Sequence, residues 1–227
     1  LSLHDALPIW NRAALAAGVF LTALAGGAWA AANRTPVEDR PEFHEAVEAM
    51  NHDRFREALP VLRTLRRQAP RSPVVGLLTA AALARADQPP DEADAALEQA
   101  LAQPGAEQAL LTWGRHNPKL AVHAENLASS LLQPRAIRQL DPDRLATLND
   151  RLGRTFRLAL AIDLTREWAR SGLAVLDDRR GEHRKAFDQF TGLIAAGKID
   201  TPKARGRMVS NLSLRAVVAL HWSLSET

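Results

Sequence analysis

The feature that most constrains this chain is a pattern that recurs after about 34 residues. Two stretches share it, "DRFREALPVLRTLRRQAP" and "PPDEADAALEQALAQP". In each, a Glu-Ala pair is followed by Leu, then by a small or apolar residue, and then by a closing Pro. Ala93 follows Ala58 after 35 residues (93 − 58), and Pro104 follows Pro70 after 34 (104 − 70). This period is typical of stacked helix pairs, each of which buries an apolar face against the next.

Apolar residues in the first stretch lie at helical spacing. They fall at i, i+3, i+4, i+7 and i+10, which is one face of a helix, and they are Phe55, Ala58, Leu59, Leu62 and Leu65. Ala and Leu, the best helix formers, are abundant in the chain, whereas aromatic residues make up only 5% and Tyr is absent. The chain is therefore predicted to be all-α.

The same pattern resembles the second helix of the tetratricopeptide (TPR) repeat, which has an aromatic residue, x-Glu-Ala, further apolar positions and a final Pro. The residues that carry the resemblance best are Phe55, Glu57, Ala58, Leu62, Leu65 and Pro70. It implies an all-α fold of stacked antiparallel helix pairs, a TPR-like α-solenoid that is partly irregular and follows an N-terminal apolar helix. The clearest repeats are expected over residues 42–72, 73–105 and 164–197. An irregular helical bundle is the alternative, because the Trp, Leu-Gly and Tyr positions of each first helix are missing.

Caps and glycines predict further boundaries. Asp141 is expected to be the N-cap of a helix with Pro142 at its first position. That helical stretch is long, and we expect an interruption near Gly153 or Gly172. A last helix is expected over Thr201–Ser223.

The N-terminal region is predicted to contain three parts. Residues 1–9, "LSLHDALPI", resemble the translated end of a widely used sequencing adapter, and we expect them to be an artefact. Residues 10–32 are expected to form a signal peptide or a single transmembrane anchor, because 13–32 carries no charge over a length that spans a bilayer. A buried Ala-rich core helix is the alternative. Residues 33–41 are predicted to be a linker, and 42–227 the helical domain.

Both membrane interpretations place the helical domain in the bacterial periplasm, either soluble or anchored to the inner membrane through residues 13–32. The absence of Cys excludes thiolate chemistry and disulfides but fits either redox compartment. The net charge of +3 gives only a mild affinity for anionic surfaces.

Motifs for catalysis and metal binding are missing from the sequence. It has no glycine-rich phosphate loop, no serine elbow and no H-E-x-x-H zinc motif. His44, Glu48 and His52 share a helix face but span about 12 Å, too far to converge on one ion, so we interpret them as solvated. We therefore expect a protein that is not an enzyme and that has no cofactor or metal.

Two alternatives to this expectation stay open. One is a helical-bundle enzyme or small-ligand-binding protein with its site in region 106–160, where His116 and His123 lie. The other is an incomplete fragment of a larger envelope protein.

Arginines form the clearest candidate surface for a partner. Such a cluster is explained either by a solvated face or by contact with an acidic partner or an anionic membrane surface. The residues expected to contact a partner are Arg63, Arg66, Arg67, Arg71, Leu78 and Arg85. The resemblance to TPR proteins implies an extracytoplasmic scaffold or assembly factor that binds a protein or peptide. No nucleic-acid partner is expected, because no stacking aromatics lie among the arginines. The tryptophans Trp113, Trp168 and Trp222 are expected to pack between helices.

Overall fold

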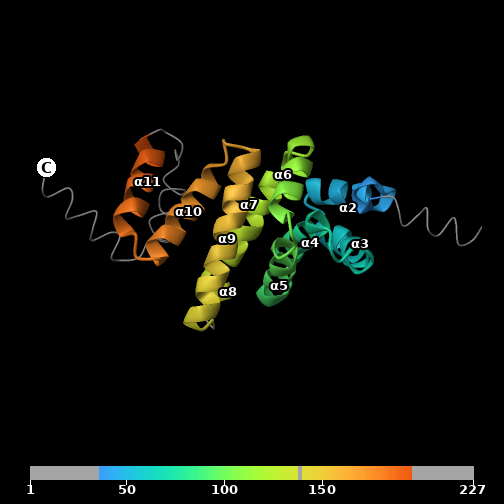
Figure 1. Ribbon diagram of the computed structural model, residues 1–227, viewed down its shortest axis with the longest axis horizontal. Coiled ribbons are helices and arrows are strands. Elements are labelled where there is room, and N and C mark those ends of the chain that lie inside the picture. The colour runs from blue at the N-terminus through green and yellow to red at the C-terminus, as the bar shows by residue number, and fades with distance from the viewer. Residues whose placement is uncertain (1–35, 138–139, 196–227) are drawn as a thin grey trace, which may run out of the picture.

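The chain forms α-helices that follow one another along its long axis (Figure 1). The computed structural model describes residues 36–137 and 140–195, and this part of the chain is helical and contains no strand. The prediction of an all-α fold is confirmed. The apolar helix expected within 10–32 and the helix expected over 201–223 lie outside the described residues.

Most of the helices are short, and α9 is the longest with 21 residues. The elements are a 3-10 helix η2 (Val37–Asp39), α2 (Pro41–Asn51), α3 (Phe55–Gln68), α4 (Pro73–Arg85), α5 (Pro90–Leu101), α6 (Ala106–His116), α7 (Lys119–Leu131), α8 (Pro134–Ile137), α9 (Pro142–Ile162), α10 (Glu167–Arg179) and α11 (His183–Ala195).

Proline sets the start of several helices. The first residues of α2, α4, α5 and α9 are Pro41, Pro73, Pro90 and Pro142. Proline loses nothing at this position, because the first N–H groups of a helix have no intrahelical acceptor. Two of these starts are also capped by side chains. Ser72 Oγ accepts from the backbone N–H of Val75 at 3.2 Å, and Asp141 Oδ1 accepts from that of Arg144 at 2.9 Å. The cap predicted at Asp141 is confirmed.

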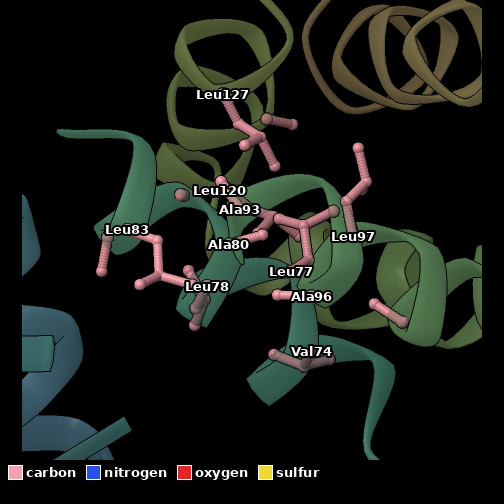
Figure 2. Close-up of a cluster of buried hydrophobic side chains, with 14 of the residues drawn as sticks. Val74, Leu77, Leu78, Ala80, Leu83, Ala93, Ala96, Leu97, Leu120 and Leu127 are labelled. Carbon is pink, nitrogen blue, oxygen red and sulfur yellow. The ribbon is translucent and has the colours of Figure 1, made fainter. Parts of the chain in front are cut away.

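Helix α4 is the centre of the core. Every residue from Val74 to Leu83 is buried, and α4 packs against α3, α5, α6 and α7. Figure 2 shows Leu77 and Ala80 of α4 among side chains of α5, such as Leu97, and of α7, such as Leu120. A helix that is apolar all round is stable only when other elements surround it. Burial of α4 therefore holds α3, α5, α6 and α7 around it.

The apolar face predicted for the first repeat is buried as expected. Phe55, Ala58, Leu59, Leu62 and Leu65 on α3 are each at most 6% exposed. Ala93 on α5, which the repeat pattern pairs with Ala58, is fully buried too, and so is Ala186 on α11. At the N-terminal edge, within the range predicted to be a linker, η2 packs on α2 and buries Val37.

The long helical stretch after Asp141 breaks at a different place from the one predicted. It ends at Ile162, where the chain turns before α10, and the glycines Gly153 and Gly172 lie inside helices. Gly172 serves close packing rather than a break. A Cβ there would lie 2.3 Å from the ring of Phe156, so α9 and α10 can approach only because the position has no side chain.

Within the described residues, no helix combines the length and the apolar character needed to cross a bilayer. The segment 13–32, for which an anchor is expected, lies outside this part of the chain.

The packing of α4 on α5 gives a test of the core. A Cβ at Gly76 would lie 2.8 Å from the Cβ of Ala100, and both atoms belong to rigid helices. We expect Gly76→Ala to lower the free energy of unfolding by about 1–3 kcal/mol, despite its better helix propensity, because the helices must separate. Urea denaturation followed by circular dichroism measures the change.

The matched control is Gly192→Ala on α11, where the added Cβ meets no atom within 4 Å. This substitution should stabilise the protein by about 0.5–1 kcal/mol, since only backbone entropy changes. Equal effects of the two substitutions would contradict the tight contact between α4 and α5.

Candidate functional site

A cavity with a partly polar lining lies between α7, α10 and α11. It is an open groove of about 270 Å³. The residues that line it are Glu125, Asn126, Ser129, Leu132, Gln133, Trp168, Ser171, Gly172, Val175 and Phe190. We call it the α7–α10 groove. Its wall mixes amide, hydroxyl and apolar groups, which is the composition of sites that fix a ligand by a few polar contacts.

Each wall of the α7–α10 groove is a continuous helical face. On α10 the lining residues follow i, i+3, i+4 and i+7 spacing from Trp168 to Val175. The α7 wall runs from Glu125 through Ser129 and continues just beyond the helix end to Gln133. The groove thus extends along two neighbouring helices, so its shape suits an extended ligand better than a compact one.

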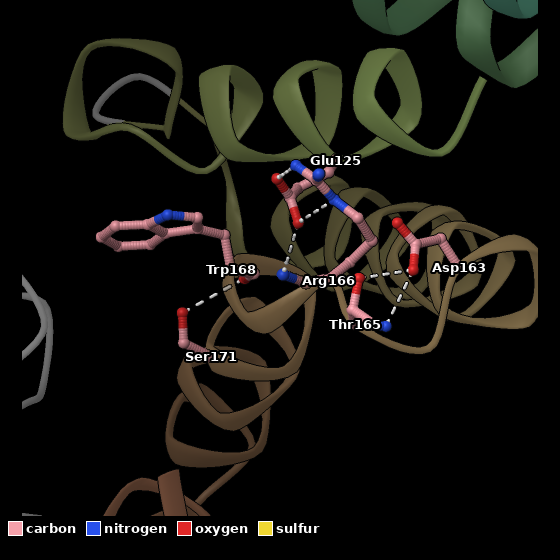
Figure 3. Close-up of polar contacts among 7 residues, drawn as sticks. Glu125, Asp163, Thr165, Arg166, Trp168 and Ser171 are labelled. Carbon is pink, nitrogen blue, oxygen red and sulfur yellow. Dashed lines mark hydrogen bonds and ion pairs between the residues drawn. The ribbon is translucent and has the colours of Figure 1, made fainter. Parts of the chain in front are cut away.

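An ion pair between the buried Glu125 and the partly exposed Arg166 holds the two walls together (Figure 3). The Glu125 carboxylate on α7 accepts from Arg166 Nε at 3.2 Å and from Arg166 Nη2 at 2.5 Å. The same carboxylate accepts from the backbone N–H of Ala169 at 3.1 Å, in the first turn of α10. Glu125 therefore satisfies an N-terminal N–H group of α10 from a different helix, because Arg166 provides no side-chain cap. The hydrogen bond to Glu125 raises the pKa of Arg166.

This pairing also determines the charge of the α7–α10 groove. Among the described residues that line it, Glu125 alone is ionisable, and Arg166 neutralises its charge. The buried carboxylate accepts three hydrogen bonds from Arg166 and Ala169, and these bonds clamp α10 on α7. The remaining polar lining consists of neutral amides and hydroxyls.

Trp168 differs from the expectation for it. It was predicted to pack between helices, but the residue is 46% exposed at the edge of the α7–α10 groove. In Figure 3 its indole projects away from the ion pair, while its backbone carbonyl accepts from Ser171 Oγ at 3.1 Å. Trp113, in contrast, is partly buried and meets Phe43 edge to face at 5.8 Å. Trp222 lies outside the described residues.

The predicted partner-binding residues are only partly brought together. Arg63, Arg66 and Arg67 line a second, open depression of about 610 Å³ with Pro70 and Gln99, and Arg71 is exposed.

Two other predicted residues lie elsewhere. Leu78 is fully buried in α4, so its assignment to a partner surface is wrong: periodicity cannot identify an outer face on a helix that neighbours surround. Arg85 is exposed, with its guanidinium 5.2 Å from the ring centre of Phe55 and 3.9 Å from Asp53.

The histidines of the alternative site have separate partners. His116 is exposed, and its Nδ1 lies 3.1 Å from the carbonyl of Thr112 on the same helix. His123 is buried, where its Nε2–H donates to Asn51 Oδ1 at 3.2 Å. Among the described residues, no group of three or more His, Cys, Asp or Glu side chains is placed to hold a metal ion. His44, Glu48 and His52 are all exposed.

Sequence reasoning missed the α7–α10 groove. Its α7 residues lie in the stretch "ENLASSLLQ", where polar residues recur on one face of an Ala- and Leu-rich helix. That face was a usable signal. The opposite wall is about 40 residues further along the chain, however, and only the tertiary packing shows that the two walls meet.

Comparison with protein-family models, with curated proteins and with solved structures finds no match to this chain.

Burial of His123 predicts acid sensitivity. Desolvation and the positive charge of Lys119 lower the pKa of His123 to about 4, and Arg85 acts in the same direction while Asp53 opposes it. Because the folded pKa lies below the unfolded value of about 6.5, protons bind the unfolded chain preferentially as the pH falls. The folded state therefore loses stability as the pH falls from the unfolded pKa to the folded one. Above the unfolded pKa, His123 is neutral in both states and causes no loss.

We expect His123→Gln, which can still donate to Asn51, to remove part of this sensitivity. Between about pH 7 and pH 5 the wild type should lose about 2 kcal/mol more unfolding free energy than the variant. Urea denaturation at the two pH values measures the difference. The exposed control, His116→Gln, should keep the wild-type acid sensitivity, and an unchanged pH dependence in His123→Gln would refute the explanation.

Proposed function

We propose that this protein is a non-enzymatic scaffold that binds an extended peptide segment of a partner protein. The α7–α10 groove is the binding site in this proposal. The observation that carries it is a neutral groove along two neighbouring helices, with a half-exposed Trp168 at its edge. Exposed tryptophan beside a preformed groove is typical of binding surfaces, because it supplies a large contact area at a low entropy cost.

The proposal includes a solenoid of helix pairs. The units would be α2/α3, α4/α5, α7/α9 and α10/α11, and the helices pack within each pair. Successive pairs are joined by contacts of α3 with α4, of α4 with α7, and of α9 with α10. In this arrangement α6 and α8 are additions to the repeat. The first helices of the third and fourth units, α7 and α10, form the walls of the groove.

Three helix ends support a common hairpin unit. The residues directly after the C-caps of α2, α4 and α10 have left-handed backbones, and they are Asp53, Asp87 and Gly181. In each case the next residue donates its N–H to the carbonyl five residues earlier: Arg54 to Ala49 at 2.9 Å, Gln88 to Leu83 at 3.3 Å and Glu182 to Asp177 at 3.0 Å. This is the Schellman ending. Asp87 follows Asp53 after 34 residues (87 − 53), which is the period of the sequence pattern.

The chemistry of the α7–α10 groove defines the ligand. Amide groups of Asn126 and Gln133 and the hydroxyls of Ser129 and Ser171 offer donors and acceptors to a peptide backbone. Val175, Phe190 and the face of Trp168 offer apolar contact for a side chain. A neutral, extended segment with at least one large apolar residue fits these groups, because none of the described lining residues offers an unpaired charge to an ionic ligand.

The proposed location is the bacterial periplasm. It rests on the uncharged segment 13–32, which suits a signal peptide or an anchor of the inner membrane. A scaffold in this place would act on folded or translocating envelope proteins.

A peptide library screened against the full chain tests the function. Peptides selected by the protein should be extended, neutral and rich in large apolar residues. Trp168→Ala should weaken the binding of a selected, dye-labelled peptide by roughly tenfold or more, measured by fluorescence anisotropy, because a central aromatic contact is lost. The matched control is Leu164→Ala, which removes another exposed apolar side chain (71% exposed) that does not line the groove.

The two substitutions distinguish binding in the α7–α10 groove from non-specific binding to exposed apolar side chains. If both weaken binding equally, or if neither does, the peptide binds elsewhere and the proposed function is wrong. The purified protein can also be assayed for hydrolysis of glycosides, esters and phosphate esters. Activity that remains after purification and is lost on substitution of groove residues would support an enzyme instead.

A further inference from the structure

A second surface depression lies where α3 and α5 meet. It is open, has a volume of about 610 Å³, and is lined by Arg63, Arg66, Arg67, Pro70 and Gln99. We call it the arginine groove. It belongs to the first two helix pairs, so its residues are separate from those of the α7–α10 groove.

The arginine groove contains more positive charge than its neighbours neutralise. Arg63 pairs with Glu92 at 2.9 Å, but Arg66 and Arg67 contact neutral oxygens of Gln99 and Thr64. Many other arginines in the described part of the chain meet a carboxylate, among them Arg54, Arg56, Arg151, Arg154, Arg166, Arg180 and Arg184. Two guanidinium groups in one depression therefore remain available to an anion.

The guanidinium of Arg66 is held in place before any ligand arrives. Its Nε donates to Gln99 Oε1 at 3.1 Å and its Nη2 donates to the same oxygen, while Gln99 Nε2 donates to the carbonyl of Pro70 at 3.4 Å. Burial lowers the pKa of Arg66, but a guanidinium stays protonated at any physiological pH. A cation that is already ordered and partly desolvated loses less entropy and hydration on binding than a free surface arginine.

The fold tolerates this charge because of its position. Arg66 and Arg67 lie in the last turn of α3, where the carbonyl end of the helix dipole favours cations. The dipole acts diffusely and forms no directed bond to the guanidinium N–H groups, several of which are not bonded to Gln99 or Thr64. Helix stability thus explains why arginines occur in this turn. It does not explain why they line one depression together with Arg63 of α3 and Gln99 of α5.

We propose that the arginine groove binds an acidic segment of a partner protein, with carboxylates on Arg66 and Arg67. The planar fork of a guanidinium matches a carboxylate in two parallel hydrogen bonds. A membrane is the weaker candidate, because Arg66 is partly buried in a depression and a flat bilayer surface reaches exposed side chains more readily. A nucleic acid is also a weaker candidate, since none of the described residues that line the groove is an aromatic one on which a base could stack.

The test uses the full chain and a dye-labelled hexaglutamate peptide, with binding followed by fluorescence anisotropy. Arg66→Gln combined with Arg67→Gln should weaken binding about tenfold, and raised salt should weaken the wild type in the same direction. The control combines Arg115→Gln with Arg144→Gln, which removes the same charge from exposed sites on α6 and α9. This control should change the affinity by less than about twofold.

A second variant is expected to strengthen peptide binding, so its test does not depend on a loss of affinity. Glu92→Gln removes the carboxylate that occupies Arg63. It should tighten hexaglutamate binding by about two- to threefold, because a third guanidinium becomes available.

Two results would overturn the proposal. One is an equal loss of hexaglutamate binding in the Arg66/Arg67 and Arg115/Arg144 variants, which indicates an effect of net charge alone. The other is binding to phosphatidylserine-containing vesicles that requires Arg66 and Arg67 while hexaglutamate does not bind, which identifies a membrane site. Neither result bears on the α7–α10 groove, so the two proposals can fail separately.

Discussion

The burial of α4 on every side is the constraint on which the rest of the structure depends. A helix whose ten consecutive residues Val74–Leu83 are all buried needs neighbours around its whole circumference, and α3, α5, α6 and α7 provide them. Close approach is possible because Gly76 leaves space for Ala100 of α5. The surrounding helices are short and amphipathic, so little of their stability is intrinsic and most of it comes from this contact.

The C-terminal helices depend on a different interaction. Beyond α9, a small apolar cluster formed by Ala174, Val175, Phe190 and Leu193 joins α10 to α11. The Glu125–Arg166 pair then fixes the start of α10 on α7. Glu125 is buried, so loss of Arg166 would leave its carboxylate without a charged partner, which costs more than the loss of an exposed pair. The clamp therefore determines the geometry of the α7–α10 groove as well as the packing of its walls.

The sequence predicted what periodicity can determine. The apolar face predicted on α3, from Phe55 to Leu65, is confirmed, because one side of that helix is buried and the other is solvated. The same reasoning failed for Leu78, since a helix buried all round has no outer face. Trp168 was expected to pack between helices but is 46% exposed, because residue type gives the average burial and not the burial at one position. The α7–α10 groove could not be predicted, since its walls meet only through tertiary packing.

The hairpin turns show how local geometry and neighbouring pairs act together. A left-handed backbone costs an L-residue about 1–2 kcal/mol, which Gly181 avoids and which Asp53 and Asp87 do not. Each Asp contacts an arginine of the adjacent hairpin: Asp87 lies 3.0 Å from Arg56, and Asp53 lies 3.9 Å from Arg85. Exposed pairs contribute at most about 1 kcal/mol, so they offset only part of the cost. The turns therefore close because the helices on either side are packed, and the two aspartates then help to set the register between the first two hairpins.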